Sequence, residues 1–250
     1  MTYIASKQNV RIKSWKKLHT AKGRQKAERY LIEGVHLVEE ALKAAVRIET
    51  LIISTHFTLD FSVDSTIELV EVSEEVVKEL SLTPTPQGIF AVCELPKQLT
   101  VWEPIGTHYL LVDAVQDPGN LGTIIRTADA AGYDGILLGE GTVDVYNDKV
   151  LRSTQGSLWH LEILNLPLEE AVSQLQAHGI PVYATALHQE AIDYREIQQS
   201  QCAIIVGNEG QGVRQSLIDQ SDASVYIPMK GKAESLNVAV ATGILLFSTH

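Results

Sequence analysis

The second half of the chain alternates short apolar runs with longer segments of helical periodicity. Short apolar runs bounded by glycine or polar residues are typical of buried parallel strands. Such runs occur at residues 109–113, 135–139, 161–164, 181–185 and 203–206. Between them, apolar residues recur at helical spacing, most clearly over residues 168–178. The alternation predicts an α/β domain in which helices cover an open sheet.

The last apolar segment, residues 238–247, differs from the other predicted helices. It is apolar on nearly every side, which predicts a helix buried all round. It is too short to span a bilayer. Ser235 or Asn237 is placed to cap its first turn.

The first 95 residues predict a smaller set of the same elements. Strands are expected at residues 30–33, 48–53, 67–72 and 88–95, and a helix at 35–44. Ser73 is placed to cap a further helix that carries Val76, Val77 and Leu80. Proline and glycine over residues 96–106 indicate a linker. The chain is therefore divided into a domain at 1–96, a linker at 97–106 and a second domain at 107–250.

Composition narrows the class of protein. The 250 residues are 45% hydrophobic, but no stretch of about 18 apolar residues and no N-terminal signal pattern occurs. We therefore expect a cytoplasmic protein without a membrane segment. Cys93 and Cys202 lie far apart and outside any Cys/His cluster, which favours buried thiols over a disulfide or a zinc site.

Charge is distributed unevenly along the chain. The formal net charge is −11, yet residues 1–30 hold nine basic side chains and only one acidic one, Glu28. A basic segment on an acidic protein can concentrate an anionic polymer at one end, although a solvated helix face or a floppy tail would have the same composition. Ile12, Trp15 and Leu18 lie at helical spacing among the cations, which favours a folded amphipathic helix over a tail.

Three polar, glycine-containing segments follow the predicted strands of the second domain. In the first, Asp117 or Asn120 can cap a helix on which Gly122 and Arg126 share one face. A ligand could approach such a bare face beneath a guanidinium, whose planar fork suits a pair of phosphate oxygens. A glycine-rich turn followed by a surface arginine is the simpler alternative.

The second and third segments are loops with several polar groups each. Residues 207–212 can present backbone N–H groups to a ligand, and Glu209 can serve there or act only as a turn carboxylate or cap. The loop does not match a dinucleotide fingerprint or a Walker motif. The third segment, residues 227–237, offers more polar side chains than capping requires.

Taken together and in order, these segments resemble the SpoU/TrmH family of ribose 2'-O-methyltransferases. The Asn-x-Gly-x-x-x-Arg pattern falls on Asn120, Gly122 and Arg126, the Gly-Asn-Glu-Gly pattern on residues 207–210, and the Ser-Leu-Asn pattern on residues 235–237. Residues 1–95 are similar to the substrate-binding domain that precedes the catalytic domain in many members. The resemblance thus covers the whole chain.

The resemblance implies a small, ribosomal-protein-like α/β domain followed by an α/β trefoil-knot methyltransferase domain, in a homodimer that needs no metal. It also implies that S-adenosylmethionine is held in the knot by six residues. These are Thr185, Leu187, Gly207, Ile227, Leu236 and Val238. Arg126 is a poor base because its pKa exceeds about 12, so we expect it to position a phosphate and the ribose hydroxyl. Four residues would orient the site around it, namely Asn120, Glu209, Ser235 and Asn237.

The resulting hypothesis is methyl transfer from S-adenosylmethionine to a ribose 2'-hydroxyl of RNA, with ribosomal RNA favoured over transfer RNA. The alternative to an enzyme is a non-catalytic protein, either an RNA-binding factor or a ribosome-assembly factor. The basic segment is the predicted RNA contact. Its candidate residues are Lys7, Arg11, Lys13, Lys16, Lys17, Lys22 and Arg24.

Overall fold

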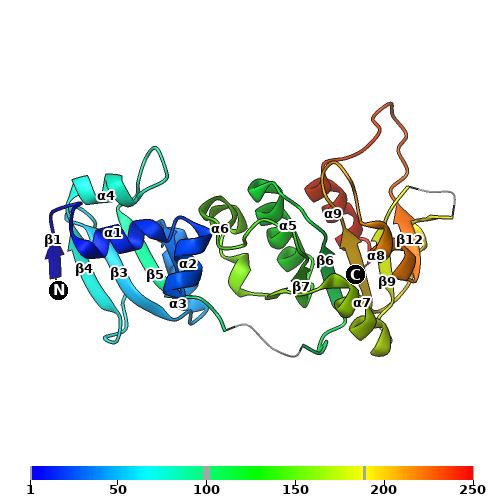
Figure 1. Ribbon diagram of the computed structural model, residues 1–250, viewed down its shortest axis with the longest axis horizontal. Helices are drawn as coiled ribbons and strands as arrows, with labels where there is room; N and C mark the ends of the chain where they lie inside the picture. The colour runs from blue at the N-terminus through cyan, green and yellow to red at the C-terminus, as the bar shows by residue number, and fades with distance from the viewer. Residues whose placement is uncertain (1, 98–101, 188–189, 250) are drawn as a thin grey trace. The chain divides into compact units, whose positions relative to one another are not determined.

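A computed structural model describes residues 2–97, 102–187 and 190–249, which form two compact units (Figure 1). Unit 1 comprises Met1–Lys97 and Tyr146–Trp159, and unit 2 comprises Gln98–Val145 and His160–His250. The segment 146–159 joins unit 1 because aromatic contacts hold both of its ends. Tyr146 packs on Tyr30 with ring centroids 4.6 Å apart, and the Trp159 Nε1–H donates to the Tyr30 hydroxyl at 3.1 Å.

Unit 1 contains a mixed five-stranded sheet in the order β1-β4-β3-β5-β2. Its strands are β1 (Thr2–Ile4), β2 (Arg29–Glu33), β3 (Ile48–Ser54), β4 (Glu68–Val72) and β5 (Ile89–Glu94). β5 runs antiparallel to both of its neighbours, while the other pairs are parallel. All four predicted strands are confirmed. The short edge strand β1 was not predicted, because three residues carry too little pattern.

The helices of unit 1 are α1 (Val10–Lys17), α2 (Ala21–Ala27), α3 (Val35–Lys43), α4 (Glu74–Leu80) and α6 (Asp148–Thr154). The single basic helix predicted near the N-terminus is in fact two, because Thr20 caps α2 and accepts a hydrogen bond from the Gly23 N–H at 3.1 Å. α1 buries Ile12 and Trp15 in the core that it shares with α4. The predicted cap at Ser73 is confirmed.

Unit 2 contains an entirely parallel seven-stranded sheet in the order β10-β12-β9-β11-β6-β7-β8. The strands are β6 (His108–Val112), β7 (Gly135–Leu138), β8 (Glu162–Asn165), β9 (Val182–Thr185), β10 (Ile192–Asp193), β11 (Cys202–Val206) and β12 (Ala223–Tyr226). The five predicted strands are confirmed. β10 and β12 were missed, since one is very short and the other mixes polar with apolar residues.

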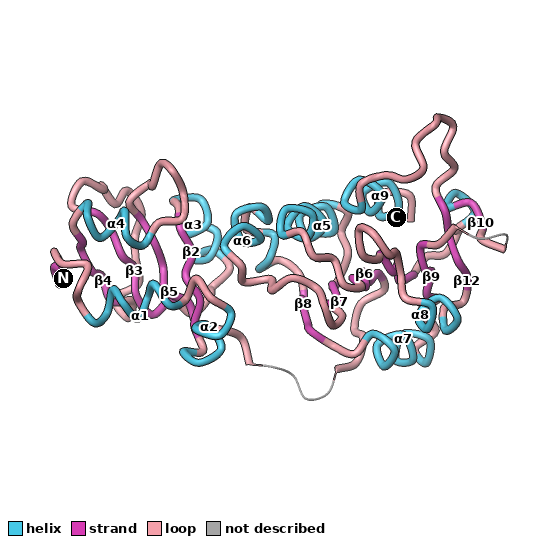
Figure 2. Tube along the Cα trace, turned by 45° about the horizontal axis from the view of Figure 1, so that its top comes forward, coloured by secondary structure: helices cyan, strands magenta, loops and turns pink. Residues whose placement is uncertain are grey.

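Helices cover both faces of this sheet (Figure 2). They are α5 (Pro118–Ala130), α7 (Leu168–Ala177), α8 (Gln215–Gln220) and α9 (Val238–Leu246). α5 packs against α9 on one face, and α7 packs against α8 on the other. The prediction that the last helix is buried all round is wrong. α9 packs on only one side, which leaves Val240 53% exposed and Phe247, just after the helix, 61% exposed.

The strand order creates a switch point between β6 and β11. From β6 the chain moves to β7 and β8 on one side, whereas β11 pairs with β6 from the other side. The Asp113 N–H donates to the Val206 carbonyl at 2.8 Å, so the carboxyl ends of β6 and β11 are adjacent. Open α/β sheets bind ligands in the crevice outside such a point.

Three further observations bear on the predicted class. Cys93 and Cys202 are buried and unbridged, as predicted. No helix among the described residues is long and apolar enough to cross a bilayer. Within the same residues, no group of three or more His, Cys, Asp and Glu side chains is arranged to hold a metal ion.

Candidate active site

Side chains from all three predicted polar segments form one hydrogen-bonded chain in unit 2. The Asn120 Nδ2–H donates to Glu209 Oε1 at 3.0 Å, and the Asn237 Nδ2–H donates to Asn120 Oδ1 at 3.0 Å. These residues are about 90 and 117 positions apart in sequence. The motifs therefore meet in space, with Asn120 at the centre.

Asn120 is placed by the start of α5. Asp117 caps the helix and accepts the Asn120 N–H at 2.9 Å, and Pro118 occupies the first turn, where its missing N–H costs nothing. Asn120 therefore lies in the first turn, and its side chain is available for Glu209 and Asn237. Of the two caps left open by the sequence, Asp117 is the one used.

The Gly-Asn-Glu-Gly loop follows β11 and folds tightly on itself. Asn208 and Gly212 exchange two backbone hydrogen bonds, at 3.1 and 3.0 Å. The Asn208 Oδ1 accepts the N–H groups of Gly210 and Gln211 inside the turn. A side chain at Gly207 would lie 2.1 Å from the Gly212 carbonyl carbon, so only glycine fits there. Glu209 is the one charged residue at the tip.

Glu209 accepts hydrogen bonds from three groups of the segment that leads into α5. Its Oε1 accepts the Asp117 N–H at 3.1 Å as well as the Asn120 amide, and its Oε2 accepts the Gln116 N–H at 3.2 Å. Partial burial raises the pKa of Glu209, but these hydrogen bonds outweigh it and leave the pKa below its usual value. Glu209 is therefore an ionised anchor.

Asn237 connects the third segment to the other two. Its Oδ1 caps α9 by accepting the N–H groups of Ala239 and Val240, at 2.9 and 3.3 Å, while its Nδ2 reaches Asn120. The Asn237 amide therefore has two roles. Its oxygen caps α9, and its nitrogen donates to Asn120 in the site. Ser235 is exposed and takes no part in this hydrogen-bonded chain.

Arg126 lies on α5 beyond Asn120 and is exposed. Within the described parts of the chain it has no hydrogen-bond or ion-pair partner, so its guanidinium is available to an anion. Gly122 is buried, which corrects the prediction of a bare glycine face shared with Arg126. The two residues are four positions apart and share one side of α5, but the backbone at Gly122 is covered whereas the longer Arg126 side chain reaches solvent.

Three of the six predicted cofactor residues lie at the carboxyl ends of neighbouring strands. Thr185 ends β9, Gly207 follows β11, and Ile227 follows β12. These three strands are neighbours and parallel, so their carboxyl ends lie side by side. Leu236 and Val238 flank Asn237 in sequence at the start of α9.

This edge suits a nucleoside with a charged tail. Leu187 is 75% exposed and offers an apolar surface to a base, while Gly207 allows close approach to the backbone. The Thr185 hydroxyl donates to the Ile205 carbonyl at 3.0 Å and so holds the end of β9 against β11. The residues present therefore fit S-adenosylmethionine.

Two residues that hold the loops together were missed by sequence reasoning. Asp113, directly after β6, is buried and binds Arg214 through both carboxylate oxygens. The Asn208 Nδ2–H donates to the Ala114 carbonyl at 2.8 Å. A carboxylate at the end of an apolar strand was the available signal for Asp113, and the motif itself contained Asn208.

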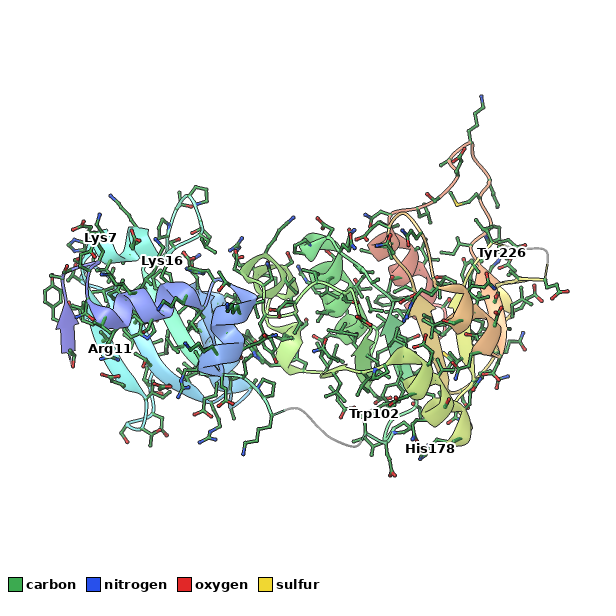
Figure 3. All side chains as sticks on the ribbon, in the orientation of Figure 1. Lys7, Arg11, Lys16, Trp102, His178 and Tyr226 are labelled. Atoms are coloured by element: carbon green, nitrogen blue, oxygen red, sulfur yellow. The ribbon has the colours of Figure 1, made fainter. Side chains whose placement is uncertain are left out.

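The predicted RNA-binding residues divide into paired and unpaired cations on unit 1. Lys7 pairs with Glu75 at 3.1 Å, Arg11 with Glu68 at 2.8 Å, and Lys16 with Glu79. Figure 3 shows these three cations around α1. Lys13, Lys17 and Lys22 are exposed and have no ion-pair partner among the described residues.

Arg24 does not belong to this exposed set. It is 4% exposed and donates to the Leu18 carbonyl at 2.8 Å. Its place in the predicted RNA contact is therefore wrong. The physical reason is the break between α1 and α2, whose turn carbonyl requires a donor.

Comparison with known proteins decides the family. Residues 107–247 match the SpoU rRNA Methylase family, and residues 9–91 match the MRM3-like substrate binding domain. The chain belongs to the SpoU rRNA methylase family. It is 46% identical over 248 residues to the 23S rRNA (guanosine(2553)-2'-O)-methyltransferase RlmP of Bacillus subtilis (strain 168), covering 99% of this chain and 98% of the relative.

Solved structures agree with this assignment. An rRNA methyltransferase from Sinorhizobium meliloti bound to AdoMet (S-adenosylmethionine) has a TM-score of 0.87 at 32% identity, over 99% of this chain and 97% of that chain. The SpoU methyltransferase AviRb from Streptomyces viridochromogenes, in complex with AdoMet, has a TM-score of 0.86 at 28% identity, over 96% and 97%.

These findings confirm the family resemblance and the fold class, a smaller α/β domain with an α/β trefoil-knot methyltransferase domain. As a SpoU family member, the protein is an S-adenosylmethionine-dependent RNA 2'-O-methyltransferase. The enzyme hypothesis is thereby confirmed over a non-catalytic RNA-binding factor.

The depressed pKa of Glu209 predicts a pH-dependent contribution to stability. A carboxylate whose pKa is lower in the folded than in the unfolded state stabilises the fold above its unfolded pKa of about 4.3, and this stabilisation is lost as the pH falls through the folded pKa. Glu209→Gln should therefore lower the melting temperature at pH 7, by a free-energy change of about 1 kcal/mol. The difference from the wild type should shrink as the pH falls below about 4.3.

Melting temperatures of both proteins between pH 7 and pH 3 check this expectation. Glu170→Gln, which removes an exposed carboxylate from α7, serves as the control and should leave the curve unchanged. Parallel curves for Glu209→Gln and the wild type would show that the Glu209 carboxylate carries no such linkage.

Proposed function

We propose that this enzyme methylates a guanosine 2'-hydroxyl in 23S ribosomal RNA, at the position modified by the Bacillus subtilis relative, guanosine 2553. The observation that carries the site assignment is the hydrogen-bonded chain from Glu209 through Asn120 to Asn237, on the helix that presents Arg126. The 46% identity along nearly the whole chain supports the choice of RNA. With this substrate, we propose that the reaction takes place in the cytoplasm.

Arg126 is the residue that we assign to the ribose. Methyl transfer requires the attacking oxygen to be aligned with the methyl group, so orientation supplies much of the rate. An exposed, unneutralised guanidinium can hold a phosphate next to the target nucleotide and stabilise negative charge that develops on the 2'-oxygen. Arginine side chains stay protonated in proteins, so Arg126 does not accept the hydroxyl proton.

The other polar residues orient the loops around Arg126. Glu209 holds Asn120 at the start of α5, and Asn237 links this point to the first turn of α9. We place Ser235 at the ribose because it is exposed in the same loop, two residues before Asn237.

In this proposal, the cofactor lies at the carboxyl ends of the neighbouring strands β9, β11 and β12. Its six contact residues are those of the sequence prediction, Thr185, Leu187, Gly207, Ile227, Leu236 and Val238. S-adenosylmethionine, when bound there, supplies the sulfonium methyl group. Backbone groups at Thr185, Gly207 and Ile227 hold the cofactor, and Leu187 covers its base.

Genetic complementation tests the proposed function. In cells that lack the enzyme, 2'-O-methylation of the target guanosine should be absent, and the wild-type gene should restore it. Arg126→Ala should reduce methylation by at least about 100-fold, since it removes both orientation and charge stabilisation. Arg126→Lys keeps the charge without the planar fork and should retain intermediate activity.

Mapping of 2'-O-methyl groups in ribosomal and transfer RNA is the measurement. Loss of a transfer RNA methyl group in the deleted cells, with ribosomal RNA unchanged, would refute the proposed substrate. Full activity of Arg126→Ala would refute the assigned role of Arg126.

RNA binding by unit 1 is the second part of the proposal. A lysine that already contacts a carboxylate gains less from a phosphate, because the existing ion pair must first be broken. Lys13, Lys17 and Lys22 are unpaired, so we assign the main phosphate contacts to them and a minor share to Lys7, Arg11 and Lys16. Each phosphate contact releases counterions, which makes binding dependent on salt.

Replacing Lys13, Lys17 and Lys22 with glutamine should weaken RNA binding and reduce the slope of log affinity against log salt by about 2. The matched variant replaces the paired cations Lys7, Arg11 and Lys16 and should reduce the slope by less than about 1. Filter binding over a range of salt concentrations measures both. Equal slopes for the two variants would show that ion pairing with carboxylates does not determine which of these cations contact RNA phosphates.

A homodimer is the third part of the proposal. Val240 and Phe247 leave apolar surface exposed at the two ends of α9, and α9 begins at Asn237 of the site. Exposed apolar groups of this kind are stabilised when a second copy covers them. We therefore propose that α9 lies at a two-fold interface.

Phe247→Asp should shift the protein toward monomer, because a buried carboxylate in an apolar interface is unfavourable. Ile105→Asp, at another exposed apolar residue of unit 2, is the control. Sedimentation equilibrium at micromolar protein measures the mass. A monomeric wild type, or a dimer unaffected by Phe247→Asp, would contradict the placement of the interface at α9.

A further inference from the structure

We propose that Asp113 is a positioning residue of the methyltransferase, acting through Arg214 on the Gly-Asn-Glu-Gly loop. This inference rests on the proposed roles of Glu209 and Asn120, because its effect on catalysis passes through them. Asp113 belongs to none of the three motif segments.

Asp113 lies at the switch point of the sheet and is fixed there by its backbone. It directly follows β6, and its N–H extends the pairing with β11 by donating to the Val206 carbonyl at 2.8 Å. Its side chain is 1% exposed. The carboxylate is thus held at the junction from which the loop departs.

The carboxylate holds the far end of the loop with two hydrogen bonds. Asp113 Oδ2 accepts the Arg214 N–H at 2.8 Å, and Oδ1 accepts the Arg214 Nε–H at 2.7 Å. One bond fixes the backbone where the loop ends, and the other fixes the side chain. A buried carboxylate bonded in this way tolerates little movement, since each lost bond leaves charge unsatisfied.

The start of the loop, at Asn208, is attached to Ala114, the residue after Asp113. The Asn208 Nδ2–H donates to the Ala114 carbonyl at 2.8 Å. Ala114 has a φ of +58°, a left-handed conformation that is unfavourable for a residue other than glycine. Its N–H is held by the Thr142 hydroxyl at 3.2 Å, so contacts on both sides maintain this conformation.

Asp113 and Ala114, two consecutive residues directly after β6, therefore hold the two ends of the loop. Between these attachments the loop projects Glu209 toward the start of α5, where it meets Asn120. A misplacement of about 1 Å at such a site can reduce the rate about 100-fold. The Asp113–Arg214 contact sets the angle at which Glu209 reaches Asn120.

Arg214 has a second carboxylate partner that serves as an internal control. Its guanidinium lies 3.4 Å from Glu169 on α7, and both side chains of that pair are more than 40% exposed. An exposed ion pair of this kind contributes little to stability. Removing Glu169 therefore alters the charge around Arg214 without releasing the loop.

The test is a double-mutant cycle on methylation of the RNA. Asp113→Asn and Arg214→Gln should each reduce kcat by about 10- to 100-fold, with KM for RNA within about threefold of the wild type, since the RNA-binding cations lie on unit 1. The double variant should be no worse than the poorer single variant, because both changes break the same contact. Glu169→Gln should retain wild-type kcat.

Hydrogen exchange gives a second readout that does not depend on activity. In Asp113→Asn, the amides of Gly210, Gln211 and Gly212 should exchange at least about tenfold faster, while those of β6 and β11 remain protected. If Asp113→Asn also loses protection in β6 and β11, the milder Arg214→Gln variant, whose altered side chain is partly exposed, decides the question.

The outcomes separate this proposal from the proposed function. Unchanged loop exchange, multiplicative losses in the double variant, or an equal loss in Glu169→Gln would each overturn the role of Asp113. Absence of methylation by the wild type would instead refute the proposed function, and hydrogen exchange would still decide whether Asp113 holds the loop.

Discussion

The Glu209 carboxylate accepts hydrogen bonds from two backbone N–H groups and one side-chain amide of residues 116–120, and the rest of the site depends on these contacts. They join a loop that follows β11 to the helix that follows β6. The Oδ1 atom of Asn120 accepts a hydrogen bond from the Asn237 Nδ2–H, and Asn237 in turn caps α9. A single ionised carboxylate thus organises three loops, because it offers several lone pairs to donors that come from one direction.

The parallel sheet makes this convergence possible. β6 and β11 are neighbours whose carboxyl ends face the same crevice, so the segments after them are close in space although about 90 residues separate them in sequence. β9 and β12 continue the same edge and bring Thr185 and Ile227 beside Gly207. Topology supplies the proximity of the loops, and their side chains supply the chemistry.

Sequence reasoning predicted the elements that have a clear apolar pattern and the motif residues that follow them. It missed β10 and β12 because their pattern is short or mixed, and it merged α1 with α2 because the capping role of Thr20 was not recognised. The ion pairs of Lys7, Arg11 and Lys16 join residues more than 55 positions apart, which periodicity along the chain cannot show. For the same reason the burial of Arg24 became visible only in the fold.

The recorded partners of the Glu209 carboxylate are all uncharged donors, and no arginine or lysine is among them. These donors are two backbone N–H groups and one side-chain amide of residues 116–120. Asp113 binds Arg214, at the opposite end of the loop from Asn208. Arg126 is exposed and, among the residues described, has no carboxylate partner, which is the state that the proposed contact with a phosphate or with the ribose oxygen requires.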